Sequence, residues 1–297
     1  MNKKNIKEYI KNIDNLKLFL EKLLEAPEDL MFVDDENEGL KEFTNLRLLA
    51  KSSSWPEAVP KELICEDQEE EKLFRAEGII SDLEISNFEG IKFLDFGCGE
   101  GHVAFVKAGQ KASKSVGYDI IDRDWCHFSK KENLIFSTNW EEIEKNGPYD
   151  FILCNDVLDH VENPLEELKK IQKVKTPQTG KIFIRIHPWT SRHGSHLYKQ
   201  LNKAYLHLVF SENELFTMGI EPEKINKVLD PINFYKDLFK QIGFTILKED
   251  DISQPIEQLF IYESIVRKRI QQNWGSEMKY EDILRIIETQ FLDFILI

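Results

Sequence analysis

Three glycines at alternate positions follow a short apolar run that contains an acid. Residues 92–96 read KFLDF, with Asp95 as the acid, and Gly97, Gly99 and Gly101 follow as G-x-G-x-G. A glycine turn between a strand and a helix lets the backbone approach a ligand closely, and the amide groups of the helix start can hold a nucleotide. His102 stands where a dinucleotide-binding turn has its last glycine, which disfavours a nicotinamide cofactor.

Further polar residues stand where later strands are expected to end. Asp119 closes a short apolar run at 116–118, and Asn139 and Trp140 follow the run at 134–137. The segment NDVLDHV begins with Asn155, directly after the run at 150–154. Because open α/β sheets bind ligands outside the carboxyl ends of their strands, we expect these side chains to line one site.

The DFGCGEG and DVLDHV segments resemble motif I and the segment after strand four of the class I S-adenosylmethionine (SAM) dependent methyltransferases of the small-molecule type. The resemblance covers about residues 71–268 and implies SAM as the cofactor. It implies that Asp119 accepts hydrogen bonds from the ribose and that Asp95 orients the loop near the amino group of SAM. An acid is usual in the family where Asn139 stands. The implied cofactor-binding residues are Asp95, Gly97, Gly99, Gly101, Asp119, Asn139, Trp140 and Asn155.

A run rich in histidines and cations at residues 185–199, RIHPWTSRHGSHLYK, points to the methyl acceptor. His187 follows the fifth expected strand and is the first candidate for a base that takes the proton of the acceptor; His160 is the second. The local cations predict an acceptor that carries an anionic or sugar-like group. We expect Arg192, His193, His196 and Tyr198 to bind this small-molecule acceptor. A metal site of His187, His193 and His196 lacks an acidic partner at a characteristic spacing, and none is predicted.

Composition restricts the other classes of function. The net charge of −14 argues against non-specific binding to nucleic acid. The segment after strand four has neither the D/N-P-P-Y/F motif nor the Pro-Cys pair of the DNA methyltransferases that it could resemble. The cysteines are scattered, no apolar run has the length of a membrane helix, and the N-terminus does not resemble a signal peptide. We therefore predict a cytoplasmic protein without a membrane span.

Alternating strand and helix patterns predict an α/β fold, a doubly wound, seven-stranded, Rossmann-like methyltransferase sheet. Strands are expected at 92–96, 116–119, 134–137, 150–154, 181–186, 244–247 and 260–266. We expect a helical extension at 1–70, the SAM-binding domain at 71–270, and an amphipathic C-terminal helix at 271–297. Residues 188–230 interrupt the pattern as a loop-like insertion on the acceptor side.

The predicted function is methyl transfer from SAM to an oxygen or nitrogen atom of a small or medium-sized acceptor. Two alternatives stay open: a non-catalytic SAM-binding or scaffolding protein on the same fold, and a nicotinamide-dependent oxidoreductase. The intact glycine turn and Asp119 argue against the first alternative, and the G-x-G-x-G spacing argues against the second.

Overall fold

The structure is a computed structural model that describes residues 46–48, 50–51, 55–60, 68–83, 85, 87–128, 130–222, 226–254, 263–274 and 279–297. Most of the expected extension at 1–70 lies outside these residues. The chain forms two compact units: residues 60–194, 224–254 and 284–297 make the larger one, and residues 1–59, 195–223 and 255–283 the other. Among the described residues, none of the helices combines the length and apolarity that crossing a bilayer requires.

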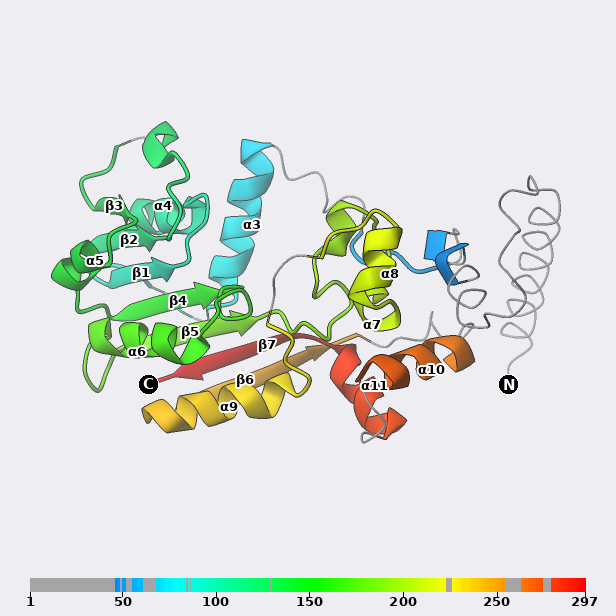
Figure 1. The fold of residues 1–297 in the computed structure, drawn as a ribbon. Helices are drawn as coiled ribbons and strands as arrows, with labels where there is room; N and C mark the ends of the chain where they lie inside the picture. The colour runs from blue at the N-terminus through cyan, green and yellow to red at the C-terminus, as the bar shows by residue number, and fades with distance from the viewer. Residues whose placement is uncertain are drawn as a thin grey trace, which may run out of the picture. The chain divides into compact units, whose positions relative to one another are not determined.

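The larger unit is built on one seven-stranded sheet with the order β3-β2-β1-β4-β5-β7-β6 (Figure 1). The strands are β1 (Lys92–Phe96), β2 (Lys114–Tyr118), β3 (Leu134–Ser137), β4 (Phe151–Asn155), β5 (Lys181–Ile186), β6 (Ile246–Ser253) and β7 (Thr289–Leu296). The first five strands pair in parallel, and β7 lies antiparallel between β5 and β6. This arrangement confirms the expected doubly wound sheet with seven strands.

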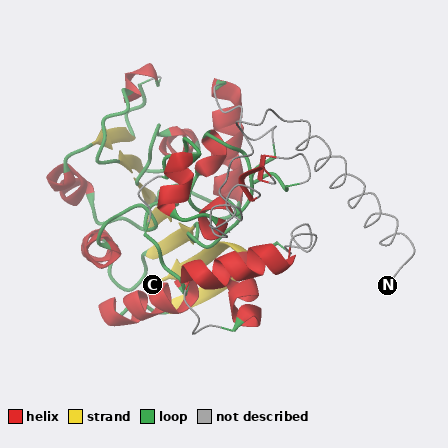
Figure 2. Cartoon of the chain, turned by 45° about the vertical axis from the view of Figure 1, so that its right-hand side comes forward, coloured by secondary structure: helices red, strands yellow, loops and turns green. Residues whose placement is uncertain are grey.

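Helices cover both faces of the sheet (Figure 2). On one face, α5 (Trp140–Asn146), α6 (Pro164–Val174) and α9 (Pro231–Ile242) pack on a core that includes Leu94, Ile152 and Ile184. On the other, α3 (Glu69–Ser81) and α4 (His102–Gly109) cover a core that includes Phe93 and Phe151. Neighbouring strand residues thus face opposite layers, the alternation expected when both faces of a sheet are buried.

Local sequence explains where the helices of this unit begin and end. Asn163 caps α6 by accepting a hydrogen bond from the amide of Glu166, and Pro164 occupies the first turn. Asp230 caps α9 in the same way, and Gly243 ends it with a φ of 90°. The helix after β4 (α6) and the helix before β6 (α9) therefore pack their apolar faces on the same side of the sheet.

The end of the chain corrects two expectations. Residues 271–297 were expected to form one helix, but α11 (Tyr280–Glu288) is followed directly by the strand β7. The strand expected at 260–266 is also wrong, because the described part of that segment belongs to α10 (Glu263–Trp274). The apolar spacing of residues 289–296 suits either a helix or a strand. The segment forms a strand because its backbone pairs with β5 on one side and with β6 on the other.

The second unit corrects the expectation of a loop-like insertion. Residues 197–217 contain η4 (Leu197–Lys199), α7 (Leu206–Val209) and α8 (Glu212–Thr217), and their apolar side chains are largely buried. Trp55 donates its indole N–H to the carbonyl of Ala204 at 2.8 Å, and Arg269 of α10 donates to the carbonyl of Val209 at 3.1 Å. Segments far apart in the sequence therefore give this part of the chain its own core.

Candidate functional site

The glycine turn between β1 and α4 is fixed by the neighbouring strand. The amides of Gly97 and Cys98 both donate to the carbonyl of Tyr118, at 2.8 and 2.9 Å. The amide of Gly101 donates to the carbonyl of Cys98 at 2.9 Å, and α4 begins at the next residue. The turn is therefore held at the carboxyl edge of the sheet, between β1 and β2.

The three glycines of the turn meet different surroundings. All three have positive φ, a conformation that side chains with Cβ disfavour. A Cβ on Gly97 would lie 2.3 Å from Val157, and one on Gly101 would lie 2.5 Å from Phe136, whereas one on Gly99 would have no atom within 4 Å. The turn is thus packed against the protein at Gly97 and Gly101 and open at Gly99, where a ligand can approach the backbone.

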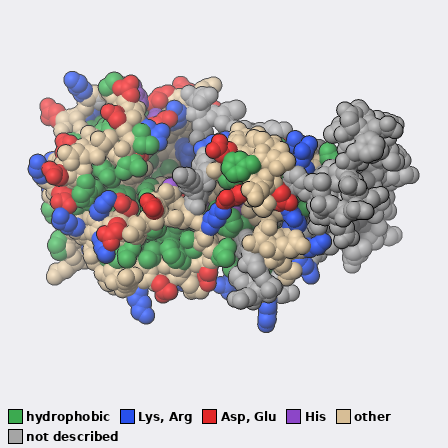
Figure 3. Space-filling model, viewed as in Figure 1, with side chains coloured by type: hydrophobic (Ala, Val, Ile, Leu, Met, Phe, Trp, Pro, Cys, Tyr) green, Lys and Arg blue, Asp and Glu red, His purple; other side chains and the backbone are tan. Residues whose placement is uncertain are grey.

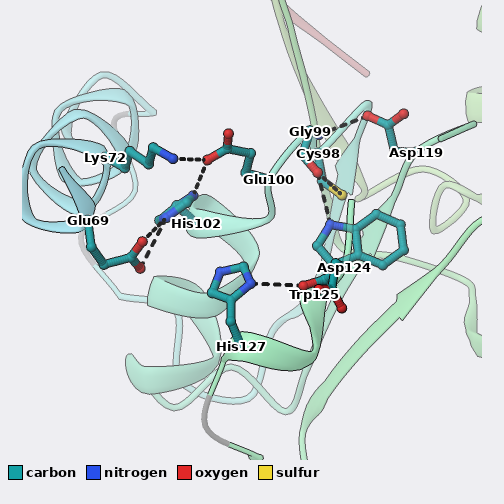
Figure 4. A network of polar contacts seen from close by, with 10 residues as sticks. All are labelled: Glu69, Lys72, Cys98, Gly99, Glu100, His102, Asp119, Asp124, Trp125 and His127. Atoms are coloured by element: carbon teal, nitrogen blue, oxygen red, sulfur yellow. Dashed lines mark hydrogen bonds and ion pairs between the residues drawn. The ribbon is translucent and has the colours of Figure 1, made fainter. Parts of the chain in front are cut away.

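Asp119 connects this turn to the end of β2. Its carboxylate accepts from the amide of Gly99 at 2.9 Å and from the amide of Ile121 at 3.0 Å. Trp125, in the short helix η3 (Trp125–His127), donates its indole N–H to the carbonyl of Gly99 at 2.9 Å (Figure 4). Both backbone groups of Gly99 are therefore held by side chains from the segment after β2.

The residues after β3 take local structural roles. Asn139 caps α5, its side-chain oxygen accepting from the amide of Glu141 at 2.9 Å. The indole of Trp140 packs edge-on against Phe96 and Tyr118 and donates to Glu144 at 2.8 Å. They therefore lie beside the ends of β1 and β2, and their contact with a cofactor stays a prediction.

Asp95 is a buried acid at the end of β1. It is 4% exposed, and its Oδ2 atom has no hydrogen-bond partner among the described residues. Burial, with a smaller contribution from the charge of Asp119, raises the pKa of Asp95 to about 7. A buried carboxyl group with an unused oxygen is suited to accept a hydrogen bond from a cationic group such as an ammonium.

A second group of acids follows β4. Asn155 donates to Asp156 at 3.0 Å, and Asp156 has a φ of 53°. Asp159 is 2% exposed and lies 3.4 Å from the Nε2 atom of His160. Burial raises the pKa of Asp156 to about 6 and that of Asp159 well above its usual value, the latter with a contribution from Asp156. The DVLDHV segment thus carries two carboxyl groups with raised pKa, and its Val157 side chain packs against Gly97 of the glycine turn.

Asn155 and His160 are the site residues predicted from this segment, and Asp156 was not predicted. Asp156 and Asp159 both belong to the DVLDHV segment on which the resemblance rests. Their burial, which makes them chemically unusual, is a tertiary property.

His187 lies directly after β5 and is 4% exposed. Its ring lies 3.9 Å from that of His193, centre to centre, and 5.1 Å from the ring of Phe291, which it stacks against. The structure therefore brings together two of the histidines predicted for the acceptor side. Phe291 was not predicted, because it belongs to the segment expected to be a helix.

Two of the cations predicted near the acceptor lie in different surroundings. Arg185 makes a bidentate pair with Asp293, its cross-strand neighbour on β7, at 2.8 and 2.6 Å, and contacts Asp82 at 3.0 Å. Because these acids occupy its guanidinium, Arg185 does not contribute a free cation to an acceptor site, a correction to the expected cluster. Arg192 is half-buried, and its amide donates to Gln290 at 3.1 Å.

His196 and Tyr198 belong to the second compact unit. His196 has a φ of 54° and precedes η4, and its ring meets that of Tyr198 edge-on at 6.0 Å. The structure pairs these two residues with each other, and their contact with an acceptor stays a prediction.

The donors and acceptors of this site fit SAM. The open turn at Gly99 can admit a ligand, and the unused oxygen of Asp95 matches the ammonium group of the methionine part. SAM binds across the carboxyl ends of the first strands in class I methyltransferases, and the sheet order and glycine turn are those of this class. The fold and the site thus define a class I methyltransferase domain with SAM as its methyl donor.

Comparison with known proteins agrees with this class. A family described as a methyltransferase domain matches residues 70–249. The chain therefore belongs to the methyltransferase domain family.

Two curated relatives are each described as a mitochondrial ubiquinone biosynthesis O-methyltransferase. The one from Arabidopsis thaliana is 26% identical over 108 residues, which cover 33% of this chain and 33% of the relative. The one from Dictyostelium discoideum is 30% identical over 113 residues, which cover 32% of this chain and 35% of the relative. The matches thus span about a third of the length of these curated relatives.

Solved structures with a similar fold include two SAM-dependent methyltransferases. The one from Archaeoglobus fulgidus is 18% identical, with a TM-score of 0.43 over 77% of this chain and 94% of the other. The putative one from Listeria monocytogenes is 14% identical, with a TM-score of 0.46 over 75% of this chain and 98% of the other.

Proposed function

We propose that this chain transfers the methyl group of SAM to a hydroxyl oxygen of a small molecule. The observation that carries the proposal is the turn at Gly99, which Asp119 and Trp125 hold on both sides while its ligand-facing side stays open. SAM, when bound, supplies a methyl group on a sulfonium, which an in-line nucleophile displaces. The residues of the chain must therefore position the cofactor and prepare the nucleophile.

On the cofactor side, each carboxyl group has a separate role. Asp119 holds the turn and accepts hydrogen bonds from the ribose hydroxyls. Asp95 accepts from the amino group of the methionine part, and the incoming positive charge favours the ionised form of this buried acid. Asn139, Trp140 and Asn155 contact the adenine and the remainder of the cofactor.

On the acceptor side, His187 takes the proton of the hydroxyl group. Its position after β5 and the neighbouring rings of His193 and Phe291 support this role, because they restrict the orientation of the imidazole. His160, with the buried carboxyl of Asp159 at 3.4 Å, is the second candidate for the base. Arg192 holds an anionic group of the acceptor, next to His193; an acceptor-binding role for His196 and Tyr198 stays a prediction.

A hydroxyl is favoured over an amine for two reasons. The two curated relatives are described as O-methyltransferases. A neutral amine can attack the methyl group through its lone pair before it loses a proton. A hydroxyl group is a weak nucleophile until a base takes its proton, so a nearby base such as His187 helps transfer to oxygen more than transfer to nitrogen. Transfer to nitrogen is the alternative outcome of the test below.

The experiment has two stages. Calorimetry with SAM, with its demethylated product and with NADH first tests the cofactor; binding of NADH and not SAM would replace the proposal by the oxidoreductase alternative. Labelled SAM is then incubated with pools of hydroxylated and amino-substituted small molecules, and the labelled product is identified. SAM binding without any methyl transfer would instead support the scaffolding alternative.

With an acceptor in hand, variants test the base and the cation. His187→Ala is expected to lower kcat by ~10²–10⁴-fold while leaving the Kd for SAM unchanged. Arg192→Ala is expected to raise the KM for the acceptor with little change in kcat. Lys181→Ala is the matched control, since this exposed cation lies at the opposite end of β5. Full turnover of the His187 variant, with loss in His160→Ala, would transfer the role of base to His160.

A further inference from the structure

A cluster of two histidines and a glutamate lies beside the glycine turn and has no part in the proposed reaction. Glu69 opens α3, His102 opens α4 and His127 closes η3. One potential ligand atom from each of the three residues lies within 4.8 Å of the others. We propose that Glu69, His102 and His127 bind a zinc ion; this inference is independent of the proposed function.

The ligand set and the burial suit zinc. Zinc takes imidazole nitrogen and carboxylate oxygen in tetrahedral sites, often with water in the fourth position. His102 is buried, whereas Glu69 and His127 are exposed, so an ion can enter from solvent and the two exposed side chains can rotate to close the remaining distance. Neutral imidazoles with one carboxylate leave the site with a single negative charge, which favours a divalent cation.

The hydrogen bonds of His127 prepare it as a ligand. Its Nδ1 atom lies 2.9 Å from the carbonyl of Asp124 and must donate, because a carbonyl only accepts. The Nε2 atom of the neutral ring therefore carries the lone pair, and Figure 4 shows this nitrogen turned toward Glu69 and His102. Histidines that bind metals commonly donate their other N–H to a carbonyl in this way.

His102 has a comparable arrangement. Its Nε2 atom lies 3.2 Å from both carboxylate oxygens of Glu69, while its Nδ1 atom lies 3.9 Å from the carboxylate of Glu100. Glu100 is itself paired with Lys72 at 2.7 Å (Figure 4). A metal ion on Nε2 would replace the hydrogen bond that this nitrogen makes with Glu69. The neutral ring would then carry its one proton on Nδ1, on the side of Glu100, which is a change of tautomer without a net release of a proton.

The three ligands come from three segments that meet at the glycine turn. Glu100 belongs to the turn itself, and Trp125, in the same short helix as His127, holds Gly99. An ion at this place would fix α3 and η3 against the start of α4. We therefore expect zinc to stabilise the segments that hold the turn.

The test is a titration of the full, tag-free chain with zinc alone, after treatment with a chelator. Calorimetry is expected to show one tight site per chain in the presence of excess Mg²⁺. Glu69→Gln and His127→Ala, both at exposed positions, are each expected to weaken binding at least ~10-fold. Glu70→Gln, next to Glu69 on α3, is the matched control and should bind zinc as the wild type does.

A spectrum separates this site from one that uses Cys126, whose thiol neighbours His127 but donates to Asp124 at 2.8 Å. Cobalt(II) in place of zinc should give visible bands of low coordination number without a sulfur charge-transfer band, and Cys126→Ser should retain them. Absence of a stoichiometric zinc site would overturn the proposal. So would unchanged affinity in the Glu69 and His127 variants, or loss of the site in Cys126→Ser.

Discussion

The interaction between Asp119 and Gly99 provides the sharpest prediction about the cofactor site. The half-buried carboxylate of Asp119 accepts from two amides, those of Gly99 at 2.9 Å and Ile121 at 3.0 Å. In Asp119→Asn the side chain keeps one carbonyl oxygen, but its NH₂ group cannot accept from the second amide. The negative charge that strengthens both hydrogen bonds, and that is proposed to face the ribose of SAM, is also lost.

The expected magnitude follows from hydrogen bonds to charged groups, which contribute about 1.5–3 kcal/mol. Loss of one such interaction between Asp119 and SAM should raise the Kd by about 10- to 150-fold. Calorimetric titration with SAM and with its demethylated product measures this change. Both ligands should be affected alike, because Asp119 acts on the ribose and the turn and not on the transferred methyl group.

Glu132→Gln is the matched control, since it removes one negative charge from an exposed position outside the site. It should bind SAM with the affinity of the wild type. If Asp119→Asn also bound SAM normally while its fold was intact, Asp119 would not contact the cofactor, and the argument from the glycine turn would be refuted.

Three further predictions concern stability. The pKa of Asp95 is raised to about 7, so between about pH 4 and 7 the folded protein keeps a proton that the unfolded chain has lost. Denaturant titrations without SAM should therefore show a free energy of unfolding that falls as the pH rises from about 4 to 7, and Asp95→Asn should reduce this decline. Gly97→Ala should lower Tm clearly, because its Cβ would lie 2.3 Å from Val157 at a φ of 77°; a Tm like that of the wild type would contradict this packing. Arg185→Gln leaves the buried carboxylate of Asp293 without its bidentate partner and should cost about 3–5 kcal/mol in the free energy of unfolding, whereas a loss below 1 kcal/mol would show that this pair is not structurally important.

The surface charge of the protein carries one further prediction. Figure 3 shows acidic and basic side chains interspersed over the visible face of the sheet-containing unit. The prediction that this acidic chain avoids non-specific binding to nucleic acid still requires a direct binding measurement at low salt.

The sequence by itself determined the features that depend on neighbouring residues. The spacing of Gly97, Gly99 and Gly101 predicted the turn, because positive φ and close packing are requirements of the local backbone. Asn163 and Pro164 are likewise residue types that favour the start of a helix, and α6 begins there. The strands at 134–137 and 181–186 have the bounds expected from their apolar runs.

The tertiary structure decided what depends on distant partners. Residues 289–296 became a strand because β5 and β6 offered their backbone groups, a choice that the spacing of the segment left open. The same pairing placed Asp293 opposite Arg185 and so removed a cation predicted for the acceptor. Likewise, Glu69, His102 and His127 carry no common motif, since only the packing of three separate segments brings their side chains together.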